Sequence, residues 1–238
     1  MDRAAVAQAI GLLDLTSLSG EEDDAAIAAL CAKASTPAGP VAAVCVEGRW
    51  VARARAELEG TGIPVAAVAN FPEGAPDPDR ARRESAAAVA DGAREVDVVL
   101  PYSAWLTGDH ATAVAVVAAA RSEAPVLKVI LETGALKDPD TIRAAAGGAL
   151  GAGADFVKTS TGKGPPGASP EAARIMLEAV REHGAGGFKA SGGVRTAAQG
   201  AGYIALADEV MGPGWIAPQT FRIGASGLLD ELLAVLGA

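Results

Sequence analysis

Three of the chain's six lysines lie inside short apolar segments that are typical of β-strands, namely Lys128, Lys158 and Lys189. Two aspartates, Asp14 and Asp97, interrupt similar segments. A single charge in such a place could be an ion pair that reaches the surface along its aliphatic stem. Five such charges on five predicted strands indicate a shared polar cluster, and because buried charge is costly unless paired, such a cluster usually has a function.

The composition of this cluster points to amine chemistry. It contains lysine and aspartate but no histidine. His110 and His183 lie in or near predicted helices, apart from the acids and cysteines, so we expect no metal site. No Ser-His-Asp set is evident. A neutral lysine, in contrast, can attack a carbonyl group and form an imine, which then serves as an electron sink.

Amine chemistry requires a lysine that loses its proton near pH 7, although the ordinary pKa is about 10.4. Lowering that pKa by roughly three units requires about 4 to 5 kcal/mol. A second ammonium group about 4 Å away supplies roughly 4 kcal/mol at an effective dielectric constant of 20, and burial acts in the same direction. Lys158 and Lys189, on the sixth and seventh predicted strands, suit this mechanism. A carboxylate partner alone would raise the pKa instead.

Glycine-rich loops after the last three predicted strands indicate a phosphate site. Gly192 and Gly193 follow the seventh strand, and residues 224–227 (GASG) follow the eighth and begin the last helix. Barrels commonly bind phosphate there through backbone N–H groups and a helix N-terminus. Lys163, in the loop after the sixth strand, can reach the same space. The alternative is that these glycines only form tight turns, and "STGKG" lacks the spacing of a P-loop.

Eight β-rich segments must position these residues, and their starts lie about 23 to 34 residues apart, the length of a strand–loop–helix–loop unit. Most are continuously apolar, as strands of a parallel sheet are when both faces are buried. The predicted strands are residues 12–16, 41–46, 64–70, 94–100, 126–132, 155–160, 187–192 and 221–226.

Ala-rich helical segments lie between the predicted strands. Three of them begin with a capping residue followed by proline and an acid, at Asp77, Asp138 and Ser169. Eight alternating units predict an α/β fold, a single-domain (β/α)8 TIM barrel over residues 1–238. The alternative is a doubly wound open sheet.

The charge and composition exclude several classes of function. The net charge of −9 argues against nucleic-acid binding, which needs a basic face. No apolar stretch of about 18 residues occurs, and the N-terminus lacks a basic region with a cleavage site. Cys31 and Cys45 are too few for a disulfide framework. We therefore expect a cytoplasmic protein that acts neither on membranes nor on nucleic acid.

Seven segments resemble the deoxyribose-phosphate aldolase family, in the family's order, from about Asp14 to Leu229. They are "LDLTSL", "NFPEG", "EVDVVLPY", "LKVILETG", "GADFVKTSTGK", "GFKASGGVRT" and "FRIGASGLL". The resemblance implies a class I aldolase on a (β/α)8 barrel, with no cofactor and no metal. It also implies reversible cleavage of 2-deoxy-D-ribose 5-phosphate to D-glyceraldehyde 3-phosphate and acetaldehyde, by a homodimer or larger homo-oligomer.

The resemblance also implies roles for particular residues. Lys158 would be the Schiff-base nucleophile, Lys189 the cation that lowers its pKa, and Asp97, with a water molecule, the proton donor and acceptor. Asp14 and Lys128 would support the proton relay. The sugar and phosphate site would contain Thr159, Thr161, Gly162, Lys163, Gly192, Gly193, Ser226 and Gly227.

The sequence departs from the family pattern at three places. Ala190 stands where proline is common, and Gly227 stands where a second serine is common, which removes one hydroxyl donor for a phosphate. The chain ends at Ala238 without the polar tail of some relatives. Cys45 is either a packed thiol or a thiol that aldehydes modify.

Two other functions stay open from the sequence. One is a Schiff-base barrel aldolase for a different aldehyde pair, and the other is a non-catalytic barrel that binds a sugar phosphate.

Overall fold

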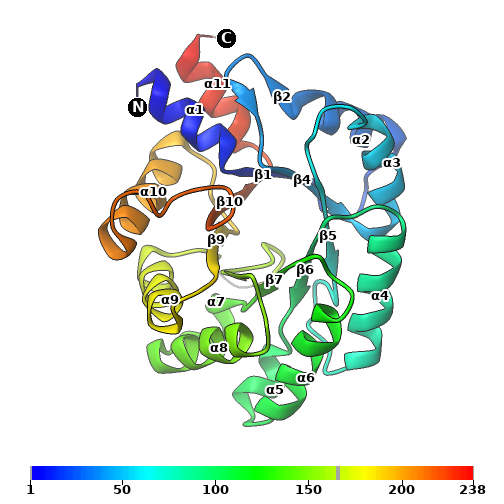
Figure 1. The fold of residues 1–238 in the computed structure, drawn as a ribbon, viewed down its shortest axis with the longest axis vertical. Coiled ribbons are helices and arrows are strands. Elements are labelled where there is room, and N and C mark those ends of the chain that lie inside the picture. The colour runs from blue at the N-terminus through cyan, green and yellow to red at the C-terminus, as the bar shows by residue number, and fades with distance from the viewer. Residues whose placement is uncertain (1, 165–166, 238) are drawn as a thin grey trace.

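The computed structural model describes residues 2–164 and 167–237, in which eight parallel strands close into a barrel (Figure 1). Around the barrel they are β1 (Leu13–Thr16), β4 (Ala43–Glu47), β5 (Val65–Ala69), β6 (Glu95–Val99), β7 (Val126–Ile130), β8 (Phe156–Lys158), β9 (Gly187–Ser191) and β10 (Phe221–Ala225). Because β1 pairs with both β4 and β10, the sheet has no edge. The predicted TIM barrel is confirmed and the open sheet is wrong. Pro165, Pro166 and Ala238, which belong to the predicted glycine loop and chain end, lie outside the described residues.

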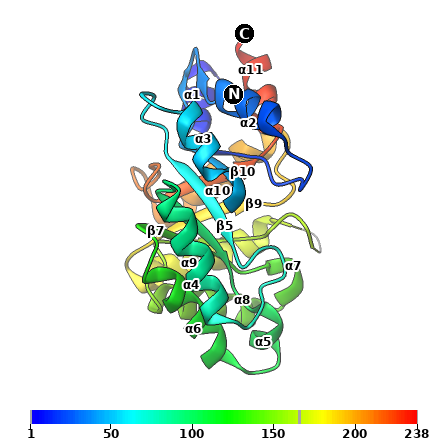
Figure 2. The ribbon, with the colours of Figure 1, turned by 90° about the vertical axis from the view of Figure 1, so that its right-hand side faces the viewer.

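Helices surround the barrel on its outer side (Figures 1 and 2). They are α1 (Arg3–Gly11), α2 (Asp24–Lys33), η1 (Gly48–Trp50), α3 (Val51–Glu57), α4 (Pro78–Ala90), α5 (Tyr102–Leu106), α6 (His110–Arg121), α7 (Thr133–Leu136), α8 (Pro139–Gly151), α9 (Pro170–His183), α10 (Ala197–Met211) and α11 (Leu228–Leu236). A short antiparallel pair, β2 (Ser35–Thr36) and β3 (Gly39–Pro40), lies between α2 and β4. Within the described ranges, no helix combines the length and apolarity needed to cross a membrane.

The three predicted capping residues begin helices as expected. Asp77, Asp138 and Ser169 each accept a hydrogen bond from the backbone N–H three residues later, at 2.9, 2.8 and 3.1 Å, and proline follows each of them. These caps satisfy N–H groups that the helix leaves free, and they start α4, α8 and α9 at the end of the barrel that carries the C-termini of the strands. The loops at this end are thereby held at fixed points.

Alternation along the strands divides the side chains into two sets. Residues such as Val96 and Val98 pack outward against the helices, whereas Glu95 and Asp97 on the same strand belong to the opposite, inward set. On β4 and β5 the inward set is apolar, and it packs with Leu18 and Phe71. The inward apolar residues are Ala43, Cys45, Ala66 and Val68. The interior therefore has an apolar wall and a charged wall.

Gly187, at the start of β9, occupies a place where no side chain fits. An added Cβ atom would lie 2.5 Å from Phe156 Cε1 and 2.6 Å from the carbonyl oxygen of Thr220. We expect Gly187→Ala to lower the free energy of unfolding by about 1–3 kcal/mol, as overpacking does in other cores. Denaturant titration measures this.

Gly147→Ala is the matched control, since Gly147 is exposed within α8 and has open space around an added Cβ. That change should raise the free energy of unfolding by about 0.5–1 kcal/mol, because alanine is the better helix former. Equal stability of Gly187→Ala and the unaltered protein would contradict the steric argument.

Candidate active site

The five charged residues singled out from the sequence meet inside the barrel. Asp14, Asp97, Lys128 and Lys189 have no exposed surface, and Lys158 is 3% exposed. Strand register explains the meeting, because Asp97 on β6 lies opposite Lys128 on β7, and Lys158 on β8 lies opposite Lys189 on β9. Side chains that are opposite each other on one face of a sheet are close neighbours.

Asp97 is the centre of this cluster. Its Oδ2 atom accepts from Lys158 Nζ at 2.7 Å and from Lys189 Nζ at 2.8 Å, and its Oδ1 atom accepts from Lys128 Nζ at 2.9 Å. Lys189 also donates to Asp14 Oδ2 at 2.5 Å. One carboxylate thus joins all three strand lysines.

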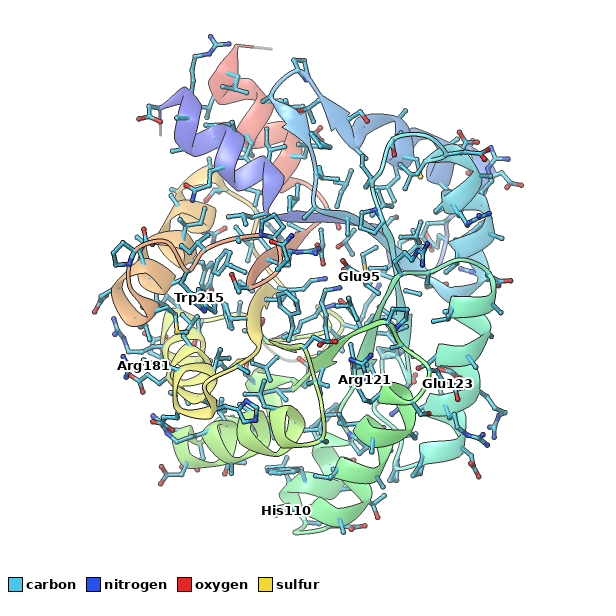
Figure 3. All side chains as sticks on the ribbon, in the orientation of Figure 1. Glu95, His110, Arg121, Glu123, Arg181 and Trp215 are labelled. Atoms are coloured by element: carbon cyan, nitrogen blue, oxygen red, sulfur yellow. The ribbon has the colours of Figure 1, made fainter. Side chains whose placement is uncertain are left out.

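Two further charged residues, Glu95 and Arg222, complete the cluster, and neither was singled out in the sequence. Arg222 donates to Asp14 Oδ1 at 2.5 Å and to Glu95 Oε1 at 2.9 Å, and the other oxygen of Glu95 contacts Lys128. Figure 3 shows Glu95 inside the ring of strands and His110 outside it. The signal that could have found Glu95 is its place two residues before Asp97, which puts both on one strand face.

The completed cluster does not balance in charge when every member is ionised. It has three carboxylates, on Asp14, Glu95 and Asp97, against the ammonium groups of Lys128, Lys158 and Lys189 and the guanidinium group of Arg222. One positive charge is in excess, among side chains that are all buried. Loss of a single proton from one lysine would restore balance.

Of the three lysines, Lys158 is the one whose pKa is lowered. Burial lowers its pKa, and the ammonium group of Lys189 lowers it further, against the opposing effect of Asp97. Burial also disfavours the charged forms of Lys128 and Lys189, but nearby carboxylates outweigh it and raise the pKa of both. Neighbouring cations likewise outweigh burial at Asp97 and hold its pKa well below the usual range.

The causes of the Lys158 shift differ in order from the sequence argument. The neighbouring ammonium group was expected to contribute most, whereas burial is the largest cause and a carboxylate contacts Lys158 directly. The pKa of Lys158 is lowered despite this contact because Lys158 and Lys189 both donate to Oδ2 of Asp97, so the negative charge of this carboxylate is shared between them.

Lys158 lines a cavity of about 680 Å³ formed by the loops that follow β1, β8, β9 and β10. Seven residues predicted to bind sugar or phosphate also line it: Thr161, Gly162, Lys163, Gly192, Gly193, Ser226 and Gly227. Sequence reasoning missed Arg195 and Glu231, which line the same cavity and add one charge of each sign. The cavity therefore joins the buried amine to loops rich in backbone N–H groups.

Thr159, which was also predicted to bind sugar or phosphate, lies outside the cavity lining. Its side chain is fully buried, donates to the carbonyl oxygen of Ser191 at 2.7 Å and accepts from the Ser191 N–H at 2.9 Å. Because Lys158 points inward, the next residue points outward. Thr159 therefore joins neighbouring parts of the barrel and is not among the residues that line the cavity.

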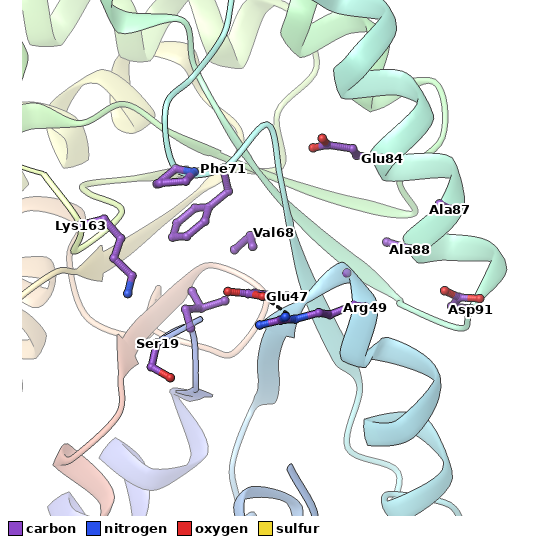
Figure 4. A pocket seen from close by; sticks show the side chains of 13 residues that line it. Ser19, Glu47, Arg49, Val68, Phe71, Glu84, Ala87, Ala88, Asp91 and Lys163 are labelled. Atoms are coloured by element: carbon purple, nitrogen blue, oxygen red, sulfur yellow. Dashed lines mark ion pairs between the residues drawn. The ribbon is translucent and has the colours of Figure 1, made fainter. Parts of the chain in front are cut away.

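A second cavity, of about 690 Å³, adjoins the first and shares Leu18, Ser19 and Lys163 with it. Figure 4 shows Lys163 pointing toward the space between Phe71 and Ser19, with the ion pair of Arg49 and Glu47 (2.8 Å) beyond. Lys163 is exposed, so its ammonium group stands in water at the border of the two cavities.

Cys45 and Ala190 lie away from the cavity. Cys45 is fully buried in the inner apolar wall, and burial raises the pKa of its thiol, which fits a packed thiol better than a reactive thiolate. Ala190 packs in the outer core. Among residues 2–164 and 167–237, no group of three or more His, Cys, Asp or Glu side chains could hold a metal ion.

The closed ring of eight parallel strands, with its lysine–carboxylate cluster inside, is a (β/α)8 barrel, a fold in which active sites lie at the C-terminal ends of the strands. Residues 8–213 match the model of the DeoC/LacD family of aldolases. The chain belongs to this family and is an aldolase.

Solved structures agree with this assignment. A candidate deoxyribose-phosphate aldolase from Toxoplasma gondii is 28% identical, with a TM-score of 0.89 over 98% of this chain and 95% of that one. A candidate from Coccidioides immitis is 32% identical, with a TM-score of 0.83 over 95% of this chain and 86% of that one. The tetrameric deoxyribose phosphate aldolase of Aeropyrum pernix shares the fold at 24% identity, with a TM-score of 0.78 over 100% and 99%.

Proposed function

We propose that this aldolase reversibly cleaves 2-deoxy-D-ribose 5-phosphate to D-glyceraldehyde 3-phosphate and acetaldehyde, through an imine on Lys158. One observation carries the proposal. Of the three buried strand lysines, the one whose pKa is lowered is also the one that lines the cavity. Family membership and the similar structures support the substrate.

The first half of the reaction forms the imine. The neutral amine of Lys158 attacks C1 of the open-chain sugar to form a carbinolamine. The carbinolamine takes up one proton from solvent, and loss of water then leaves a protonated imine. Because Lys158 Nζ lies 2.7 Å from Asp97 Oδ2, the protonated imine gives this carboxylate a positive partner that the neutral amine does not supply.

The second half breaks the sugar. The C3 hydroxyl group loses its proton, the C2–C3 bond breaks, and its electrons flow into the imine to leave an enamine on Lys158. D-Glyceraldehyde 3-phosphate departs, the enamine takes a proton at C2, and water releases acetaldehyde. We assign these proton transfers to Asp97 with a water molecule, supported by Asp14 and Lys128.

The phosphate group would bind at the loops after β8, β9 and β10. Ser226 and Gly227 lie at the start of α11, where backbone N–H groups favour an anion. Gly192 and Gly193, after β9, line the same cavity, and Lys163 adds a cation. We also infer a cytoplasmic enzyme that forms a homodimer or larger homo-oligomer, which light scattering after size-exclusion chromatography measures.

Reductive trapping tests the proposal. Borohydride added with 2-deoxy-D-ribose 5-phosphate should attach the sugar or its two-carbon fragment covalently to Lys158, as peptide mass spectrometry would show. Protein that stays unlabelled, or label that persists in Lys158→Leu, would refute the imine. Product analysis would show whether the enzyme instead cleaves a sugar to a different aldehyde pair. Binding of the sugar phosphate without turnover would indicate a non-catalytic sugar-phosphate sensor.

Lys163→Met should raise the KM for 2-deoxy-D-ribose 5-phosphate about tenfold or more, because a charge-assisted hydrogen bond is worth about 1.5–3 kcal/mol. The same variant should cleave unphosphorylated 2-deoxy-D-ribose as the unaltered enzyme does. Steady-state kinetics with both sugars measure the difference. Lys33→Met, which alters an exposed lysine paired with Asp230, is the control. Equal losses with both sugars would contradict a phosphate role for Lys163.

A further inference from the structure

Glu132, just beyond the end of β7, has an unusual conformation for a non-glycine residue. Its φ of 57° lies in the left-handed region, and its side chain is only 1% exposed. Such a backbone costs about 1–3 kcal/mol and persists where surrounding contacts determine it. The contacts of its carboxylate group are therefore informative.

The Glu132 carboxylate holds the loop that follows β8. Oε2 accepts from the hydroxyl group of Thr161 at 2.5 Å and from the Thr161 N–H at 3.3 Å. The Thr161 hydroxyl oxygen in turn accepts from the N–H of Lys163 at 3.0 Å. Gly164 passes close over the same carboxylate, since a Cβ atom added there would lie 3.5 Å from Oε2. A chain of two hydrogen bonds thus joins Glu132 to the backbone of Lys163.

The second carboxylate oxygen of Glu132 lowers the stability of the folded protein. Oε1 is buried and has no hydrogen-bond partner in the part of the chain that the structure describes. A buried polar atom left without a partner costs about 1–3 kcal/mol. Among the described residues, the hydrogen bonds of this carboxylate go only to Thr161, so its contribution lies in the loop that it holds.

We propose that Glu132 is a positioning residue for phosphate binding: it fixes the loop from Thr161 to Gly164, and so the place of Lys163. Glu132 is not among the residues that line the cavity and acts through Thr161. The inference rests on the proposed function for its substrate, but the anchoring itself concerns only an anion at Lys163.

The direction in which phosphate affinity changes when Glu132 is altered distinguishes a loop anchor from a purely electrostatic effect of its charge. A carboxylate near the site repels a phosphate, so charge alone predicts tighter binding when Glu132 is neutralised. Anchoring predicts weaker binding when the side chain is removed, and near-normal binding in Glu132→Gln, whose amide oxygen can still accept from Thr161.

The test uses Glu132→Gly, which removes the carboxylate and suits a left-handed backbone, so folding is retained. Calorimetric titration with inorganic phosphate should show about tenfold weaker binding in Glu132→Gly and in Thr161→Val, the size of one lost hydrogen bond to a charged group. The double variant should be no weaker than the weaker single variant, because both changes break the same chain of contacts. KM for 2-deoxy-D-ribose 5-phosphate should rise in parallel in both variants, and in Glu132→Gly kcat for unphosphorylated 2-deoxy-D-ribose should be unchanged.

Glu84→Gln is the matched control. Glu84 accepts at 2.6 Å from the N–H of Asn70, which is also left-handed (φ 52°) at the end of a strand, but it holds a different loop. The phosphate affinity of the Glu84→Gln variant should equal that of the unaltered protein. Tighter or equal phosphate binding in Glu132→Gly, or additive losses in the double variant, would overturn the anchoring. Phosphate binding that follows the expected pattern without turnover of the sugar would support it and refute the proposed function instead.

Discussion

Lys158→Leu is expected to lower kcat for cleavage of 2-deoxy-D-ribose 5-phosphate by about 10⁴-fold or more, because removal of a nucleophile leaves only binding and electrostatic effects. The cavity should still bind inorganic phosphate, since Lys158 lies at the strand end and the phosphate loops are intact. Coupled assay of glyceraldehyde 3-phosphate release measures the loss.

The same variant should remain folded. Without Lys158 the cluster has three carboxylates against Lys128, Lys189 and Arg222, so its charges balance. Leucine in this buried place should leave the midpoint of thermal unfolding equal or higher. Lys33→Leu is the control for losing a surface lysine, with kcat unchanged. Substantial turnover by Lys158→Leu would exclude the imine mechanism.

Lys189→Met is expected to shift the pH dependence of kcat/KM rather than to abolish activity. Removing this ammonium group ends its repulsion of Lys158 and frees Asp97 Oδ2 to pair with Lys158 alone. Both changes raise the pKa of Lys158, so a smaller fraction is neutral at pH 7. Each unit of increase lowers kcat/KM at pH 7 about tenfold.

The direction of the shift in the pH profile depends on which protonation form of Lys158 is active. Neutral Lys158 is the nucleophile, so activity is lost as pH falls through its pKa, and a raised pKa moves that loss to higher pH. The activity of the variant should therefore recover at higher pH than the activity of the unaltered enzyme does. The pH profile of Lys189→Arg, which keeps the positive charge, should lie between that of Lys189→Met and that of the unaltered enzyme. A variant profile parallel to that of the unaltered enzyme would show that Lys189 does not act through the pKa of Lys158.

Much of the fold was predictable because local signals and long-range geometry agree. The apolar strand segments, the spacing of the units and the caps at Asp77, Asp138 and Ser169 all favour one architecture, and the structure has it. Short elements were missed where no periodic pattern exists, as in α5, α7 and the pair of β2 and β3. The expected strand over 126–132 ends at Ile130 because Glu132 turns left-handed.

The candidate site was predictable in its residue types and less so in its contacts. Charges inside apolar segments pointed to Lys158 and Asp97, but the sequence does not show which carboxylate a lysine contacts. Thr159 points away from the cavity because it follows Lys158, the last inward residue of β8, and side chains alternate along a strand. Glu95 and Arg222 stand at the starts of their strands, where charged residues are ordinary.

The pairing of Arg222 with Asp14 and Glu95 constrains how this barrel can diverge over generations. Each member of the cluster contacts at least one partner of opposite charge, at 2.5 Å between Arg222 and Asp14 and 2.9 Å between Arg222 and Glu95. Losing Arg222 removes a cationic partner from both Asp14 and Glu95 in a buried site. Breaking a buried pair by removing one member costs up to about 3–5 kcal/mol, whereas replacing both members by apolar residues is often neutral. Descendants of this sequence should therefore change here in compensated pairs, and an inherited single substitution at Glu95 or Arg222 should be rare.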